Sequence, residues 1–521
     1  MGLKMKDWIN SNKRNIIFAV GAVLFAFSWI GFVFTPMTGD IKVFLASANQ
    51  SHYISEDIIV GAFKAWELKS VFSRTLMYLL YKIACLFTSY GTLSFEILCK
   101  ALYTVMIAAL NLLSIKLLAG KDRKKVVIGT MLTSAAFMAM HTGSQMQVEM
   151  TTALLILLAY ALYINAIETN KFSAAKLLCS GFLIGSTFFF KSALLLLSVT
   201  VVAAVCIYLL NHNKKLSIKR MLTVASGSAI CLVATFVLIL LINPSEIQDM
   251  IDASAFQSTL LSVKIPIKDL AVTFLTRHKE YLVFLPVVTV GVASLLINSV
   301  YDLKHRKFLT FLFRITMWLM PAVFVLLSNK YFIYHFAAYI FPSLVDICDL
   351  GKKKRLLYKC LLGTSLTLAI AWYTVAFSVV SANFEAYYQC NITAYEKTAA
   401  ELKTIDFVRE ENTLYLDAGC GGYCLGNPSH IKYFFPLPLQ RLPEDSTLTC
   451  HTESLEAAMS FDGKYIAVDK NWFFYSGKYA QLREKMETQY EYVASYYMFS
   501  PPFSYDPNAA DINEFKLYEK K

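Results

Sequence analysis

Residues 172–210 read FSAAKLLCSGFLIGSTFFFKSALLLLSVTVVAAVCIYLL, and this stretch decides the fold class. As a single helix it would be roughly 58 Å long, about twice the ~30 Å thickness of the hydrocarbon core of a bilayer. It must therefore form two spans, Phe172–Phe190 and Ser192–Leu210, and Lys191 between them is the natural break. Two adjacent apolar spans predict an integral membrane protein.

The composition of the whole chain agrees with a polytopic membrane protein. The 521 residues are 56% hydrophobic and only 17% charged, whereas about a quarter of the residues of a soluble protein are charged. The other apolar runs that approach the ~20 residues of a span are Asn15–Thr35, Phe95–Leu118, Val126–Met140, Met150–Ile167, Met221–Ile242, Tyr281–Asn298, Leu309–Leu327, Tyr331–Ile347 and Leu356–Val380. We therefore expect an α-helical bundle of about eleven transmembrane helices, each near that length.

Basic clusters between the spans set the expected orientation. Positive residues concentrate in cytoplasmic loops, and four clusters should share that side with the N-terminus: Lys121–Lys125, Asn213–Arg220, Leu303–Lys307 and Lys352–Arg355. They do so only if Val71–Phe87 does not cross the bilayer. This segment carries Arg74 and Lys82, and we expect it to be an amphipathic helix at the interface. The N-terminus is then cytoplasmic and the C-terminal part of the chain is extracytoplasmic.

The composition changes near residue 383. From Asn383 to Lys521 there are 13 Lys and Arg against 20 Asp and Glu, and the pattern is that of a mixed α/β protein. TLYLDAG and KYIAVD are typical of strands, and YAQLREKMETQY is typical of a helix. We therefore divide the chain into a transmembrane domain, residues 1–382, and an extracytoplasmic α/β domain, residues 383–521.

Three features of this C-terminal part leave alternatives open. Four cysteines outside the membrane permit disulfides whose pairing the sequence does not specify; they are Cys390, Cys420, Cys424 and Cys450. The segment YLDAGCGGY imitates the glycine-rich motif of S-adenosylmethionine-dependent methyltransferases, but prolines follow where that fold needs a helix, so we interpret the glycines as shaping a tight turn. The dense aromatic residues either pack the core or form a platform for sugars of an acceptor.

An acid follows the first span at the outer surface. Asp40 lies in FVFTPMTGDIKVFLASANQ, residues 32–50. One interpretation is a solvated loop acid, and the other is a general base at the lipid–water boundary, where partial desolvation raises the pKa of a carboxylate. An enzyme that needs two carboxylates could use Asp40 together with Glu67, which lies farther along the same loop.

Basic residues gather on the same outer face, where they are normally disfavoured. Lys191 is either an interfacial lysine or the ligand of an anion. In SNKYFIYHF, Lys330 and Tyr334 share one helical face because they lie four residues apart. We expect a phosphate site formed from Lys191, Lys330, Tyr334, His335, Arg74 and Arg277. Glu96 and Lys100, at i and i+4 inside a span, we expect to neutralise one another.

The chain resembles the GT-C superfamily of membrane glycosyltransferases, which includes the protein O-mannosyltransferases and the lipid A aminoarabinose transferase. The resemblance rests on TGDIKVF after the first helix, the interfacial segment SRTLMYLLYKIACLFTSYGTLSFEILCKAL, the lysine in STFFFKSALLLL and the late segment NKYFIYHFAAYIFPSL. It covers roughly Met1–Val380. Many relatives carry Asp-Glu in the first loop, whereas here Ile41 follows Asp40, so Glu67 is only a substitute for a second carboxylate.

The resemblance implies an inverting transfer of a sugar from a polyprenyl-phosphate donor to a glycan, lipid or protein acceptor at the extracytoplasmic face, as in cell-envelope glycan biosynthesis. Asp40 would deprotonate the acceptor hydroxyl, and Lys191, Lys330 and His335 would hold the departing lipid phosphate. Such a donor needs no nucleotide, the resemblance leaves a role for a divalent metal ion open, and nucleic acid is not expected as a partner.

Two other functions fit part of the pattern. A transporter or flippase for a lipid-linked saccharide should place charges near mid-bilayer and show repeat symmetry, whereas here the charges collect at one face. A glycan ligase or polymerase that uses a lipid diphosphate donor would share most of these features, and the sequence does not separate it from the first function.

Overall fold

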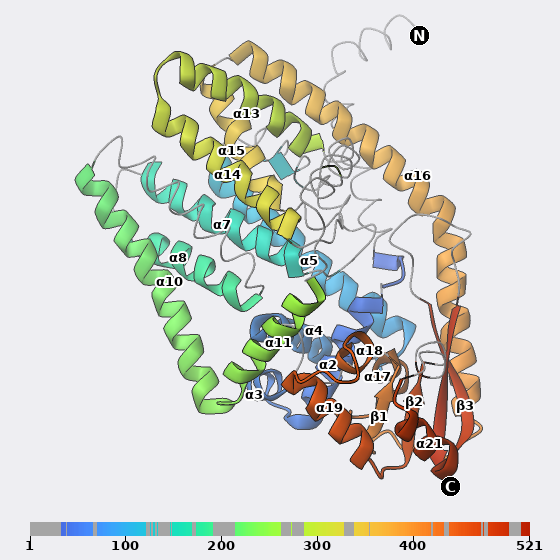
Figure 1. The fold of residues 1–521 in the computed structure, drawn as a ribbon. Coiled ribbons are helices and arrows are strands. Elements are labelled where there is room, and N and C mark those ends of the chain that lie inside the picture. Colours follow the sequence, from blue (N-terminus) through green and yellow to red (C-terminus); the bar gives the residue numbers. More distant parts are fainter. Residues whose placement is uncertain are drawn as a thin grey trace, which may run out of the picture.

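The computed structural model describes residues 33–37, 39–65, 70–120, 148–168, 173–190, 214–261, 286–327, 338–353, 355–417, 420–431, 437–469, 478–499 and 512–521, with a few isolated positions besides. A helical bundle carries a small domain with a β-sheet at one end (Figure 1). We call that end the domain end. The opposite end, where α13 (Pro286–Lys304) is followed by α14 (Phe308–Leu327), is called the basic end.

Several helices of the bundle are long and apolar enough to cross a membrane. Among the described residues four qualify: α5 (Leu93–Ala119), α7 (Val148–Glu168), α10 (Lys214–Ile242) and α13. Two shorter apolar helices are α8 (Ala174–Phe190) and the first part of α14. The chain is therefore a helical multi-span membrane protein. The predicted spans Val126–Met140 and Ser192–Leu210, and most of Asn15–Thr35, lie outside the described residues, so the count of eleven stays a prediction.

α8 and α10 pack closely because glycines line their interface. A Cβ atom on Gly181 would lie 1.9 Å from the carbonyl oxygen of Val224, and one on Gly227 would lie 2.2 Å from that of Leu178. Small residues at such positions allow helix backbones to approach closely inside a membrane, where no hydrophobic effect drives helices together. The opposite face of α10 exposes large apolar side chains, as expected of a helix that faces lipid: Leu222, Ile230, Val233, Leu240 and Leu241.

Short helices cover the domain end of the bundle: α2 (Gly39–Ile54), α3 (Ile58–Lys64), α4 (Val71–Cys85) and α11 (Glu246–Leu261) (Figure 1). α3 begins where it does because the Asp57 carboxylate accepts hydrogen bonds from the N–H groups of Ile59 and Val60. α4 would measure only about 22 Å along its axis, which is too short to cross a bilayer. The prediction that Val71–Phe87 does not span the membrane agrees with this length.

The last helices connect the bundle to the C-terminal domain. α15 (Ile340–Lys353) ends in a basic segment, and α16 (Arg355–Leu402) runs from the basic end into the C-terminal domain (Figure 1). With 48 residues, α16 is about 72 Å long, so it extends well beyond the membrane thickness. The compositional change at residue 383 falls inside this helix, and the division into residues 1–382 and 383–521 remains a proposal.

The C-terminal domain contains a four-stranded mixed sheet in the order β1-β2-β4-β3. Its strands are β1 (Thr413–Leu416), β2 (Tyr465–Val468), β3 (Tyr490–Phe499) and β4 (Ile512–Lys520), of which β1 and β2 are parallel and the other pairs antiparallel. The helices are α17 (Cys420–Leu425), α18 (Leu437–Arg441), α19 (Thr449–Ser460) and α21 (Ala480–Gln489). The strands predicted at TLYL and YIAV and the helix predicted around residues 480–489 are confirmed.

Two expectations about this domain are corrected. Cys390, Cys424 and Cys450 are free thiols in the described part of the chain, so the disulfides that the sequence permitted do not form among them. Gly421 and Gly422 of YLDAGCGGY lie in the short helix α17 rather than in a tight turn. The carboxylate of Asp417 in this segment accepts a 2.6 Å hydrogen bond from the hydroxyl of Tyr496. This carboxylate therefore forms a hydrogen bond inside the domain, which does not favour the nucleoside-binding role it would have in a methyltransferase.

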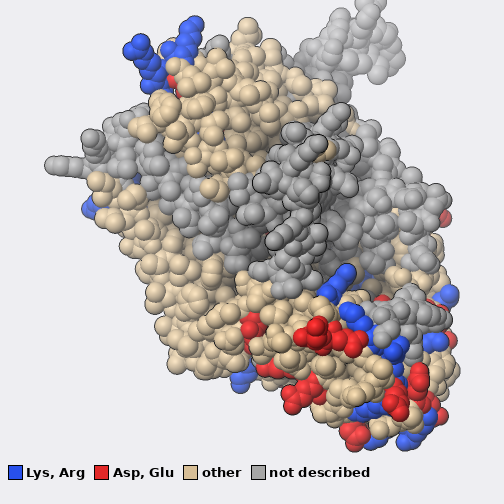
Figure 2. All heavy atoms as spheres, in the orientation of Figure 1, with Lys and Arg blue, Asp and Glu red and all other residues tan. Residues whose placement is uncertain are grey.

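Charged side chains are concentrated at the two ends of the molecule. Figure 2 shows acidic and basic side chains over the C-terminal domain and a smaller group of Lys and Arg where α13 joins α14. The described surface between these two groups is mostly uncharged. Lys304, Arg306 and Lys307 are exposed in that second group. An uncharged belt between two charged ends is the pattern of a protein that spans a bilayer.

Candidate functional site

A buried acid on α5 holds the segment that carries Asp40. Glu96 lies in the first turn of α5, and its Oε1 accepts a hydrogen bond from the backbone N–H of Met37. Its Oε2 lies 3.6 Å from the Nζ of Lys42, and both side chains are 2% exposed. Glu96 therefore contacts the chain three residues before Asp40 and again two residues after it.

The same carboxylate is connected to the C-terminal part of the chain. Its Oε2 accepts hydrogen bonds from Asn391 Nδ2 at 3.2 Å and from the Tyr395 hydroxyl at 2.9 Å, and both residues lie on α16. The hydroxyl groups of Tyr395 and Tyr423 are 2.8 Å apart. Burial raises the pKa of the Tyr423 phenol well above its usual range, and the Glu96 carboxylate adds to this effect. The phenol therefore stays neutral and acts as a hydrogen-bonding group.

The expected pairing of Glu96 with Lys100 is not the main contact of this acid. Within the described residues the buried Nζ of Lys100 has no hydrogen-bond partner, whereas Lys42 forms the ion pair with Glu96. The sequence argument considered only neighbours one helical turn away. Lys42 comes from a different helix, 54 positions earlier in the chain, and helix α2 brings it to Glu96.

Arg74 on α4 is a buried cation with spare hydrogen-bonding capacity. Its side chain is 1% exposed, and its Nη2 donates to Glu246 Oε1 on α11. Within the described part of the chain, Nε and Nη1 of Arg74 have no hydrogen-bond partner. A guanidinium cannot lose its charge in a protein, and its five N–H groups form a fixed fork that matches phosphate and carboxylate. Buried N–H groups without partners are costly unless a ligand supplies the acceptor.

The end of α8 lies against the start of α4. The hydroxyl groups of Ser70 and Ser73 donate to the backbone carbonyl of Phe190 at 2.7 and 2.9 Å. Phe190 is the last residue of α8, and Lys191 follows it directly in the chain. The chain therefore leaves α8 in hydrogen-bond contact with the helical turn that carries Arg74.

Of the predicted site residues, the structure describes the side chain of Arg74 and only the backbone of Asp40. Arg74 is described in full, and the backbone of Asp40 is the second residue of α2. The side chain of Asp40 is outside the description, as are the other predicted residues: Glu67, Lys191, Arg277, Lys330, Tyr334 and His335. Their roles remain predictions.

The sequence analysis missed several buried charged residues at the domain end, among them Lys42, Glu246 and Glu149. Lys42 and Glu246 are described above, and Glu149 begins α7 with a side chain that is nearly inaccessible. Close to Glu149, the hydroxyl groups of Tyr103 and Thr151 are 2.9 Å apart. Lys42, only two residues after Asp40 in an otherwise apolar run, was the strongest available signal in the sequence.

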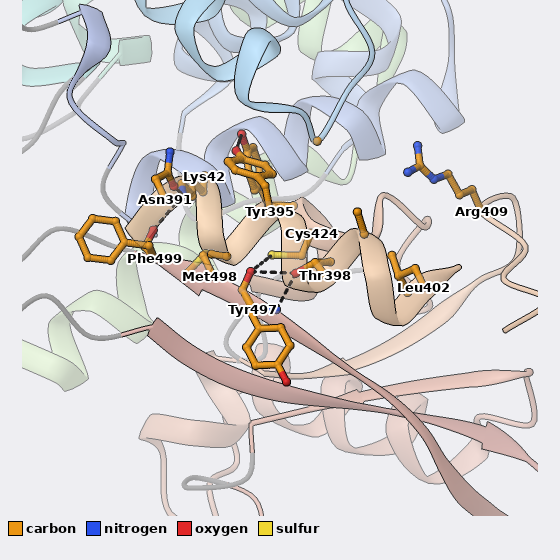
Figure 3. Close-up of a pocket in the computed structure, with 14 residues that line it drawn as sticks. Lys42, Asn391, Tyr395, Thr398, Leu402, Arg409, Cys424, Tyr497, Met498 and Phe499 are labelled. Carbon is orange, nitrogen blue, oxygen red and sulfur yellow. Dashed lines mark hydrogen bonds between the residues drawn. The ribbon is translucent and has the colours of Figure 1, made fainter. Parts of the chain in front are cut away.

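A small cavity lies beside Lys42 where α16, α17 and β3 meet (Figure 3). Its volume is about 70 Å³, and its lining includes Tyr395, Tyr423, Tyr497 and Arg409. This volume holds a few water molecules but not a sugar ring. Within the described ranges no three His, Cys, Asp or Glu side chains are grouped as a metal site would require. A divalent metal ion therefore remains a prediction that depends on Asp40 and Glu67.

Comparison with known proteins identifies the fold. No protein-family model matches the sequence. No curated protein matches it by sequence either. Among solved structures, ArnT from Cupriavidus metallidurans in the apo state matches with a TM-score of 0.54 at 11% sequence identity, and the match covers 98% of each chain. The structure of ArnT from the same organism bound to undecaprenyl phosphate matches with a TM-score of 0.50 at 12% identity, again over 98% of each chain.

The chain has the fold of ArnT. ArnT is a lipid A aminoarabinose transferase of the GT-C superfamily, so the resemblance drawn from the sequence is confirmed at the level of the fold. The match covers the C-terminal domain as well as the bundle, whereas the sequence resemblance stopped near residue 380.

Proposed function

We propose that this protein is an integral-membrane inverting glycosyltransferase. It transfers a sugar from a polyprenyl-phosphate donor to a glycan, lipid or protein acceptor at the extracytoplasmic face, as a step in the synthesis of cell-envelope glycans. The N-terminus is cytoplasmic, and the domain end, including residues 383–521, is extracytoplasmic. The described basic cluster Leu303–Lys307 at the opposite end of the bundle supports this orientation.

The observation that carries the proposal is the buried guanidinium of Arg74. Its Nη2 donates to Glu246, and its Nε and Nη1 have no hydrogen-bond partner within the described residues. A phosphate group supplies the acceptors that these N–H groups lack, and each charge-assisted hydrogen bond contributes about 1.5–3 kcal/mol. The ArnT fold supports a lipid-borne phosphate as the ligand, since one ArnT structure of this fold contains undecaprenyl phosphate.

In this proposal the other predicted basic residues surround the same phosphate. Lys191 follows Phe190, whose carbonyl accepts from Ser70 and Ser73 on the first turn of α4. This link supports Lys191 as a second ligand beside Arg74. Lys330, Tyr334, His335 and Arg277 complete the proposed set. Several cations around one group neutralise the charge that develops as the lipid phosphate leaves.

In the proposed reaction Asp40 is the general base. It removes the proton from an acceptor hydroxyl while the oxygen attacks the anomeric carbon of the donor sugar. The bond between that carbon and the phosphate oxygen breaks, and the polyprenyl phosphate leaves with the bonding electrons. Attack opposite to the leaving group inverts the configuration at the anomeric carbon. Glu67 is the proposed second carboxylate.

A transfer assay with the purified protein tests this proposal. Polyprenyl-phosphate sugars and the corresponding polyprenyl-diphosphate sugars are offered in parallel, so that a diphosphate-using ligase gives the opposite preference. Asp40→Asn should lower transfer from the monophosphate donor by about 10²-fold or more, in the range of general-base catalysis. Glu56→Gln, an exposed acid on the same loop, is the matched control and should retain activity. Unchanged transfer by Asp40→Asn at normal expression would exclude Asp40 as the base.

A further inference from the structure

We propose that the C-terminal domain positions the segment that carries Asp40, and that Lys42 is the positioning residue that connects the two. This inference rests on the proposed function, in which Asp40 is the base. It assigns to the C-terminal domain a role in the transfer step itself, in addition to any role in holding an acceptor.

The first argument is that Asp40 lies between two anchored positions. The N–H of Met37 donates to Glu96 Oε1, and the Nζ of Lys42 lies 3.6 Å from Glu96 Oε2. Asp40 is in the first turn of α2, between these two contacts. The direction in which the first turn of α2 presents its side chains is therefore set by one carboxylate on α5.

The second argument is that Lys42 ties this anchor to the C-terminal domain. Its Nζ donates to Phe499 O at 2.8 Å at the end of β3, and to Asn391 Oδ1 at 3.0 Å on α16 (Figure 3). An ammonium has three N–H groups, and three partners surround this one: Phe499, Asn391 and Glu96. The three partners belong to the sheet, to the long helix and to the membrane bundle.

The burial of Lys42 indicates a role in position rather than in stability. The residue is 1% exposed, and removing an ammonium from water costs several kcal/mol, which a buried ion pair repays only with good geometry and further hydrogen bonds. An apolar side chain would avoid this cost, although it would leave the Glu96 carboxylate without its cation. A buried lysine with three defined partners therefore contributes a fixed arrangement of α2 rather than extra stability.

The third argument is that the far end of α2 is held by the same domain. Asn49 Nδ2 donates to Gly426 O at 2.9 Å, and the Tyr53 hydroxyl donates to the same carbonyl at 3.1 Å. The N–H of Ser429 donates to Gln50 Oε1 at 2.6 Å. Gly426 has φ +78°, a backbone conformation that favours glycine. Both ends of α2 are thus bound to the C-terminal domain.

The small cavity beside Lys42 makes the proposal testable without unfolding the protein. If the ammonium is removed, water in the cavity of about 70 Å³ can donate hydrogen bonds to the carbonyl of Phe499 and the amide oxygen of Asn391. The Glu96 carboxylate loses its cation, which lowers stability, but it keeps the hydrogen bonds from Met37, Asn391 and Tyr395. We therefore expect Lys42→Met to fold, with α2 less firmly held. Lys64→Met is the matched control, because Lys64 is an exposed lysine on the neighbouring helix α3.

The test combines steady-state kinetics with hydrogen exchange on the full-length protein. Lys42→Met should lower kcat by about 10- to 100-fold, since small misplacement of a catalytic group has effects of this size, while KM for the polyprenyl-phosphate sugar stays within about threefold. Amide exchange in residues 39–54 should become faster, and exchange in α19 and α21 should not change. Lys64→Met should change none of these quantities.

Two further variants separate positioning from general damage. Lys42→Arg keeps the charge and should recover part of kcat. Tyr395→Phe removes only the hydroxyl that joins Glu96 to Tyr423, and should lower kcat by a few fold with the donor KM unchanged. If Lys42→Met leaves kcat unchanged, or leaves exchange in residues 39–54 unchanged, the positioning role is wrong.

The two proposals fail in distinguishable ways. If the wild-type protein transfers no sugar from any polyprenyl-phosphate donor, the proposed function is wrong, and the hydrogen-exchange comparison alone decides the other proposal. Faster exchange of α2 in Lys42→Met then still supports the link between Lys42 and the domain, and unchanged exchange overturns it.

Discussion

Two buried arginines, at opposite ends of the bundle, are treated differently by their surroundings. Each guanidinium nitrogen of Arg314 on α14 has a carboxylate partner. Its Nε donates to Asp302 Oδ2 at 2.7 Å, its Nη1 to Asp346 and its Nη2 to Asp349. Arg74 at the domain end has one carboxylate, Glu246, and two nitrogen atoms without partners among the described residues.

The difference separates a structural cation from a ligand-binding one. Around Arg314 two helices contribute acids, α13 with Asp302 and α15 with Asp346 and Asp349. Trp318 Nε1 and Asn298 Nδ2 donate to Asp346 as well. Such a network fixes α13, α14 and α15 to one another and leaves nothing for a ligand. At the domain end, polar contacts join the bundle, the short helices α2, α4 and α11, and the C-terminal domain. Among the described cations there, Arg74 has a fork of donors of which two nitrogen atoms lack a partner.

The largest effect is expected from removing Arg314. Arg314→Leu leaves three carboxylates buried or half-buried without their cation, and breaking a buried ion pair in this way costs about 3–5 kcal/mol. We expect a large fall in the midpoint of thermal unfolding of the detergent-purified protein, or failure to obtain monodisperse protein. Lys304→Leu removes an exposed charge from the same end and should change the midpoint little. A similar small shift in both variants would contradict the structural role of Arg314.

A smaller and more selective effect is expected at Arg74. Arg74→Lys keeps a positive charge opposite Glu246 but loses the planar fork of donors. Because the lysine ammonium still faces Glu246, the free energy of unfolding should fall by much less than in Arg314→Leu, whereas the KM for a polyprenyl-phosphate sugar should rise roughly 10- to 100-fold. Lys82→Gln, on the same helix, is the control. Loss of stability without loss of donor affinity would make Arg74 a second structural arginine.

The smallest effect is expected from acidification, which weakens the C-terminal domain without altering either arginine. His451 is buried, with Nδ1 3.1 Å from the Ser446 carbonyl and Nε2 3.0 Å from the Tyr479 hydroxyl. Burial, with Lys478 nearby, lowers the pKa of His451, and the Ser446 carbonyl opposes this only in part.

The sign of the pH effect follows from this pKa. Because the folded-state pKa is below the unfolded value of about 6.5, the neutral histidine contributes stability above that pH, and this stability is lost as the pH falls through the folded-state pKa. Amide protection factors in α19, which are corrected for the intrinsic pH dependence of exchange, should fall on acidification in the wild-type protein and less so in His451→Gln. An equal fall of the protection factors in both proteins would show that another group is responsible.

Much of the fold could be predicted from the sequence because membrane spans and short buried strands leave local patterns. The charges of Arg74 and Lys82 within an apolar run indicated that α4 does not cross the bilayer. The apolar runs TLYL and YIAV indicated strands. The β3–β4 pair was not predicted, since the aromatic residues of YEYVASYYMF were interpreted as core packing or a sugar platform. The 48 residues of α16 were also missed, because its polar second half has no span-like signature.

The candidate site could be predicted only in part, because its contacts join distant parts of the chain. Arg74 was proposed as a phosphate ligand, and its burial with unused donors supports that proposal. Its partner Glu246 is 172 positions away, and the partner of Glu96 is Lys42 rather than the neighbouring Lys100. Local spacing identifies charged residues in a membrane protein, but it does not determine which of them meet.

The most direct test is a structure of the protein with undecaprenyl phosphate bound. The proposal predicts a phosphate oxygen within about 3 Å of Nε or Nη1 of Arg74. Nη2 should still donate to Glu246, and the contacts of Arg314 should be unchanged. A phosphate held elsewhere, with Arg74 in contact with Glu246 alone, would contradict the assignment of Arg74 as the donor-binding arginine.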